Sequence, residues 1–81
     1  MLNKKSPIGI VHSTKDIGKA IRAKRKSDGL TQIDAAALCG VGARFLGELE
    51  RGKESAQVGK VIRIAQGLGL ELQIAYKGIK R

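Results

Sequence analysis

The stretch over residues 31–52 constrains the fold of this 81-residue chain more than any other part of it. Thr31 is placed to cap a short helix over residues 32–39, and Gly40 interrupts the helical pattern after it. The inward positions of that helix hold only small side chains, those of Ala35, Ala36 and Cys39. Because no bulky side chain keeps the backbones apart, the sequence predicts that a neighbouring helix approaches this one closely.

The next helix along the chain is predicted from about Ala43 to Arg51. Its inward pair is Leu46 and Leu49, and Gly52 follows its end. Two short helices joined by a glycine-containing turn are typical of a helix-turn-helix. The second helix of such a unit projects an outer face that can enter the major groove of DNA. Its outward positions are Ala43, Arg44, Gly47 and Glu48.

The flanking segments predict two further helices. The first begins after Ser13, with Asp16 in its first turn, and ends at Gly29. The fourth covers about residues 56–68 and is capped by Ser55. Its apolar stripe is Val58, Val61, Ile62, Ala65 and Leu68. The expected fold class is therefore mainly α, with four to five helices in one helix-turn-helix domain.

A strand is predicted after the last helix. Its apolar side chains alternate with others, which is the period of a half-buried strand: Leu70, Leu72, Ile74 and Tyr76. A lone strand cannot satisfy its backbone, so we expect it to pair antiparallel with its copy in a homodimer. Residues 8–11 allow a second, weaker strand. The symmetry would place two recognition helices about 34 Å apart, which matches a palindromic operator.

Composition narrows the classes of function. The net charge is +9, and its excess lies in residues 1–30 and 57–81, which favours a polyanion partner. One cysteine and one histidine allow neither a disulfide nor a thiolate–imidazole zinc site, so no metal and no cofactor are expected. The single cysteine fits a reducing cytoplasm, where a DNA-binding protein would associate with the nucleoid. The longest charge-free stretch, residues 35–43, is too short to span a membrane.

Two other classes fit poorly. A general RNA-binding module is disfavoured because the chain has only two aromatic residues for stacking. An enzyme is not expected, because the acids at positions 48, 50 and 54 have no base, nucleophile or metal cluster beside them.

The chain resembles the Cro/cI-like (XRE-type) helix-turn-helix family over about residues 14–76. The residues that carry the resemblance are Leu30, Thr31, Gln32, Ala36, Gly40, Val41, Leu46, Leu49, Glu50, Arg51 and Gly52. Residues 44–53, followed after one helix by residues 68–72, resemble the HipB-like antitoxins more specifically. This implies a repressor of its own operon that binds double-stranded DNA and a HipA-like kinase toxin. The alternative is a phage- or plasmid-type regulator without a toxin.

The resemblance also implies roles for individual residues. The base-reading positions are Arg44, Ala43, Phe45 and Glu48. Arg44 is the first choice for guanine, because it is the only long donor on the outward face. Phe45 would contact a thymine methyl group or fill the space left by Ala35, and Glu48 would accept from cytosine or remain a solvated charge.

Five positions are implied as contacts to DNA phosphates: Thr31, Gln32, Gly42, Lys53 and Ser55. Arg25 and Glu50 are implied as a structural ion pair, because a partly buried carboxylate needs a charged donor. The expected organisation is a basic arm over residues 1–13, the DNA-binding domain over 14–69 with its motif at about 31–51, the dimerisation strand over 70–77 and a basic tail over 78–81.

Overall fold

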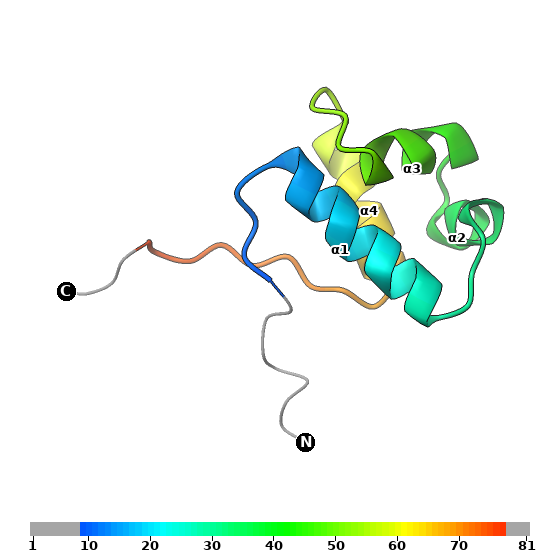
Figure 1. Ribbon diagram of the computed structural model, residues 1–81, viewed down its shortest axis with the longest axis horizontal. Helices are drawn as coiled ribbons and strands as arrows, with labels where there is room; N and C mark the ends of the chain where they lie inside the picture. The colour runs from blue at the N-terminus through cyan, green and yellow to red at the C-terminus, as the bar shows by residue number, and fades with distance from the viewer. Residues whose placement is uncertain (1–8, 78–81) are drawn as a thin grey trace, which may run out of the picture.

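Four helices make up the domain in the computed structural model, which describes residues 9–77 (Figure 1). They are α1 (Thr14–Ser27), α2 (Gln32–Cys39), α3 (Ala43–Glu50) and α4 (Val58–Gly67). α3 packs against both α1 and α2, and α2 also packs against α4. The mainly α architecture predicted from the sequence is confirmed.

Local signals set the ends of α1 and α2 where the sequence predicted them. Ser13 Oγ accepts a hydrogen bond from the Asp16 amide at 3.3 Å, and Thr31 Oγ1 accepts one from the Asp34 amide at 3.0 Å. Gly40 ends α2 with a φ of 72°, a left-handed conformation that strains any residue with a side chain. The turn between α2 and α3 is therefore determined by short-range chemistry.

α4 differs from its prediction at its start and on its buried face. It begins at Val58 with Gln57 as N-cap, so Ser55 does not cap it. Val58 and Ile62, predicted to face inward, are exposed. The buried positions around α4 are Val61, Ile64, Ala65 and Leu68. The prediction was wrong because α4 is apolar on two neighbouring faces, and only one of them packs into the core.

The core is aliphatic, and its helices come close where side chains are small. The largest fully buried side chains are Ile21, Leu46, Leu49 and Ile64. Cys39 faces Gly67 on α4, where an added Cβ would lie 2.6 Å from the cysteine Sγ. Burial raises the pKa of the Cys39 thiol, which therefore remains protonated at neutral pH. The close approach predicted for the small inward face of α2 is confirmed.

Gly18 holds a second close approach, between α1 and the end of α3. A Cβ at Gly18 would overlap the carbonyl oxygen of Leu49 and lie 3.0 Å from that of Glu50. Both obstacles are backbone atoms, which cannot rotate away. The position of α1 on α3 therefore depends on a glycine that the sequence pattern did not single out.

Gly18→Ala is expected to lower the free energy of unfolding by about 1–3 kcal/mol, because the overlap outweighs the better helix propensity of alanine. The matched control is Gly59→Ala on α4, whose Cβ would meet no other atom within 4 Å. That variant should be more stable than the wild type by about 0.5–1 kcal/mol. Urea unfolding measures both changes, and equal effects of the two alanines would contradict the packing argument.

Residues 9–13 and 70–77 lie on the side of the domain away from α2 and α3 (Figure 1). The described chain contains no strand, so the strand predicted over residues 70–77 is not confirmed in the single chain. The weaker strand is likewise absent from residues 9–11, and its first residue, Ile8, lies outside the described range, as do most of the predicted arm and the tail over 78–81. Within residues 9–77, the two segments do not pair with each other as strands.

An apolar groove runs along this side of the domain. α1, α4 and the two terminal segments line it, with side chains that include Ile10, Ile17, Ile62, Leu72, Ile74 and Tyr76. Ile74 and Tyr76 are fully exposed, whereas Leu70 packs against the core and its amide donates to the Ala65 carbonyl at 2.8 Å. No residue of α2 or α3 is among the described residues that line the groove.

Candidate nucleic-acid interface

A buried ion pair joins α1 to α3 beneath the helix-turn-helix. Arg25 Nε donates to Glu50 Oε2 at 2.7 Å, and Arg25 Nη2 donates to Glu50 Oε1 at 3.0 Å. Arg25 Nη1 donates to the Leu30 carbonyl at 2.8 Å, and Gln32 Nε2 donates to Glu50 Oε1 at 3.0 Å. These are the two side chains expected to pair, and their contacts tie α3 to α1 and to the start of α2.

The carboxylate of Glu50 is held in its ionised form. Burial alone would raise its pKa, but hydrogen bonds from Arg25 and Gln32 outweigh burial and bring the pKa of Glu50 below its ordinary value. The hydrogen bond to Glu50 in turn raises the pKa of Arg25. Each charge therefore depends on the other, since either one alone would be a desolvated charge without a partner.

The exposed face of α3 presents one carboxylate between two cations. Arg44 Nε donates to Glu48 Oε2 at 3.3 Å, and Lys53 Nζ donates to Glu48 Oε1 at 3.1 Å. The hydrogen bond from Lys53 contributes most to lowering the pKa of Glu48, with a smaller contribution from Arg44. The Arg44 side chain is 91% exposed and the Glu48 side chain 24%, so the arginine is far more accessible to a ligand than the carboxylate.

This exposed face is narrower than the sequence predicted. Gly47, predicted to point outward, is buried, and a Cβ there would lie 3.3 Å from Gln32 Oε1. The prediction failed because Gln32 reaches across from α2 to the Glu50 carboxylate and covers this side of α3. Ala43 is partly buried against the core. Arg44 and Glu48 are thus the side chains that make up the exposed face of α3.

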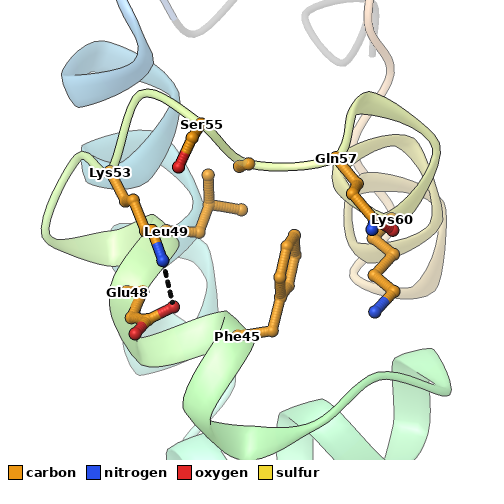
Figure 2. A pocket seen from close by; sticks show the side chains of 8 residues that line it. Phe45, Glu48, Leu49, Lys53, Ser55, Gln57 and Lys60 are labelled. Atoms are coloured by element: carbon orange, nitrogen blue, oxygen red, sulfur yellow. Dashed lines mark hydrogen bonds and ion pairs between the residues drawn. The ribbon is translucent and has the colours of Figure 1, made fainter.

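Phe45 occupies the gap between α3 and the start of α4. Figure 2 shows its ring pointing away from the α3 ribbon into the space between the loop after α3 and Gln57. The ring is partly buried against the core, and Lys60 Nζ lies 5.3 Å from its centroid. This position agrees with a space-filling role, the second of the two roles considered for Phe45, but the gap that the ring fills lies beside the start of α4.

The positions expected at phosphates surround α3. Thr31 and Gln32 are at the start of α2, Gly42 is the N-cap of α3, and exposed Lys53 and Ser55 lie in the loop before α4. The first amides of an α-helix have no partner within the helix, which makes the starts of α2 and α3 suitable for an anion. The side-chain amide of Gln32 has two N–H hydrogens. One is donated to Glu50, so the other can be donated to a ligand.

The sequence analysis did not predict that Glu48 accepts from both Arg44 and Lys53, nor that Lys60 lies over the ring of Phe45. The contact between Arg44 and Glu48 could have been predicted, because the two residues lie four positions apart on one helix. Within residues 9–77, no group of three His, Cys, Asp or Glu side chains is placed to hold a metal ion. None of the helices described is both long enough and apolar enough to cross a membrane.

Comparison with known proteins places this geometry among DNA-binding regulators. The model of the helix-turn-helix family HTH_3 matches residues 21–74. The uncharacterized HTH-type transcriptional regulator y4mF of Sinorhizobium fredii is 44% identical over 66 residues, which cover 82% of this chain and 87% of that protein.

Solved structures share the fold. A chain in a HipA–HipB–O2–O3 complex aligns with a TM-score of 0.79 at 18% identity, covering 88% of this chain and 100% of that one. The restriction-modification controller protein C.AhdI of Aeromonas hydrophila aligns with a TM-score of 0.65 at 28% identity, covering 72% of this chain and 88% of that one.

Proposed function

Because this chain belongs to the helix-turn-helix family HTH_3 and is a DNA-binding transcriptional regulator of that type, we propose that it represses transcription from a palindromic operator. The observation that carries this proposal is the Arg44 side chain, which is 91% exposed on a helix that the Arg25–Glu50 pair holds in place. A helix held in place with one long, exposed donor fits bidentate recognition of guanine in the major groove.

The remaining contacts position the protein on DNA. Glu48 accompanies Arg44 on the face of α3 that meets the base edges, and Ala43 and Phe45 lie beside it, partly buried against the core. The phosphate contacts come from Thr31, Gln32, Gly42, Lys53 and Ser55. With a net charge of +9, binding should weaken steeply as salt concentration rises, because each phosphate contact releases counterions.

Arg44→Ala is expected to weaken operator binding by about 1–3 kcal/mol and to remove the preference at one base pair. Lys53→Ala is the companion variant, and it should weaken binding to all sequences alike and lower the salt slope by roughly one. Fluorescence anisotropy on labelled duplexes at several salt concentrations measures both effects. Unchanged operator affinity in Arg44→Ala would show that α3 reads DNA with other residues.

The operator-binding form is a homodimer. The segment over residues 70–76 pairs antiparallel with its copy, so that Leu72, Ile74 and Tyr76 of one subunit are covered by the other. The support is the exposure of these side chains beside an open apolar groove, together with their alternation along the chain. Two copies of α3 then face successive turns of the operator.

The protein partner is a HipA-like kinase toxin, and this chain is its antitoxin. The fold of the HipB chain in the HipA–HipB–O2–O3 complex supports this. So does the outer face of α2, where Ile33 is 71% and Leu38 61% exposed beside exposed Ala37. Co-purification of the tagged chain from its native operon tests the assignment, since a kinase encoded next to it should bind in stoichiometric amount.

The second candidate is a stand-alone regulator without a toxin. The likeness to the controller protein C.AhdI, at higher identity than the HipB chains, favours it. In that case the co-purification yields the chain alone, while footprinting of the upstream DNA still shows a protected palindrome.

A further inference from the structure

Glu48 stands at the centre of the exposed face of α3, yet it is an acid where DNA is expected. Its two carboxylate oxygens are divided between two cations, Oε2 for Arg44 and Oε1 for Lys53. A carboxylate that is only a solvated surface charge is not expected to bond to a cation through each of its oxygens. The arrangement therefore calls for a role that uses the cations as well as the acid.

Helix stability does not account for the contact with Arg44. In an α-helix, an acid placed four residues before a base is favourable, and the reverse order found here contributes less. An exposed ion pair of this kind adds little to folding in water. The contact matters more in a major groove, where water is partly displaced and the effective dielectric constant falls.

The atoms involved determine which edge of the guanidinium is free. Glu48 accepts from Arg44 Nε, and within residues 9–77 no hydrogen bond engages Nη1 or Nη2 at the far end of the side chain. Those two nitrogens form the fork that matches O6 and N7 of guanine. An arginine whose Nε side is held presents this fork in one orientation, and less conformational entropy is lost when it binds.

We propose that Glu48 is a positioning residue that sets the base preference of Arg44 by holding the Nε side of its guanidinium. This inference rests on the proposed function, since it concerns how the same face reads DNA. It differs from direct recognition of cytosine by Glu48. Both carboxylate oxygens already accept from cations, and the Glu48 side chain is only 24% exposed, whereas that of Arg44 is 91% exposed.

The test uses full-length protein and a duplex selected from a random pool by the wild type, together with its single base-pair variants. Glu48→Gln is compared with Arg44→Ala and with Glu54→Gln. Glu54 is an exposed carboxylate in the loop after α3, so its replacement makes the same change in charge. Fluorescence anisotropy gives the ratio of affinities for each base pair.

Glu48→Gln is expected to reduce discrimination about three- to tenfold at the one base pair where Arg44→Ala also loses it. Glu54→Gln should strengthen binding to all duplexes alike and leave every ratio unchanged. In an Arg44→Ala background, Glu48→Gln should change no ratio further.

Two results would overturn the inference alone. A loss of discrimination at a different base pair would show that Glu48 contacts DNA directly, and unchanged ratios would show that its charge is incidental. If the wild type enriched no site from the pool, the proposed function would fail first, and the inference would fall with it.

Discussion

Glu50→Ala is expected to lower the free energy of unfolding by about 3–5 kcal/mol, the largest stability change that we predict for a single substitution in this domain. The cost arises because Arg25 would keep a buried positive charge whose two bonds to the carboxylate are lost. Gln32 would lose its acceptor as well. Urea unfolding followed by circular dichroism measures the change.

A double-mutant cycle separates the pair from its surroundings. Arg25→Ala with Glu50→Ala should cost clearly less than the sum of the two single variants, because the second substitution removes a charge that already has no partner. Additive costs would mean that the two side chains do not stabilise each other. If Glu50→Ala does not fold, Glu50→Gln keeps the shape of the side chain and serves in the same cycle.

The same pair predicts how stability depends on pH. The pKa of Glu50 lies lower in the folded chain than its ordinary value of about 4.3. The ionised carboxylate therefore contributes fully to the free energy of unfolding when the pH is above its ordinary pKa. This contribution is lost as the pH falls through the pKa of the folded chain. Thermal melting of Glu50→Gln should accordingly show a shallower loss of stability on acidification than the wild type.

Ile74→Asp is expected to convert the proposed homodimer into a monomer and to weaken binding to a two-half-site operator by a factor of about 10²–10⁴. Binding of the second subunit would no longer be intramolecular, so its effective concentration is lost. Ile74 is fully exposed in the single chain, so the substitution does not disturb the core. Light scattering and anisotropy measure the two effects.

The matched control is Ala75→Asp, which adds the same charge on the other side of the alternation and should leave the dimer intact. A point substitution is preferable to truncation after Gly69, because truncation also removes Leu70, which packs against the core. If Ile74→Asp remained a dimer with unchanged operator affinity, the interface would have to lie on another face.

The helix ends were predictable because their causes are local. A threonine or serine before a helix and a glycine after it act within a few residues, so Ser13, Thr31 and Gly40 could be assigned from the sequence. The small side chains on the inward face of α2 likewise predicted that another helix packs closely against it. They could not say that the neighbour was Gly67, because contacts between distant segments depend on how the helices pack.

The errors arose where the local sequence pattern was equally compatible with two different buried faces of a helix. α4 carries apolar side chains on two faces, and only packing decides that Ile64 is buried while Ile62 is not. Gly47 lay on the predicted outward face, but the side chain of Gln32 covers it from α2. The bonds around Glu48 depend on side-chain rotamers, which no sequence pattern specifies.

The groove at the chain ends is lined by none of the α2 or α3 residues, and this separation has an evolutionary consequence. Substitutions at distant, unconnected positions have additive effects, so in the proposed dimer changes confined to α3 alter the operator without altering assembly. A duplicated gene could acquire a new operator in a few steps while its product still paired with the parental subunit. Such mixed pairs would recognise a hybrid site, with one half from each lineage, so regulatory circuits could branch before the two proteins ceased to associate.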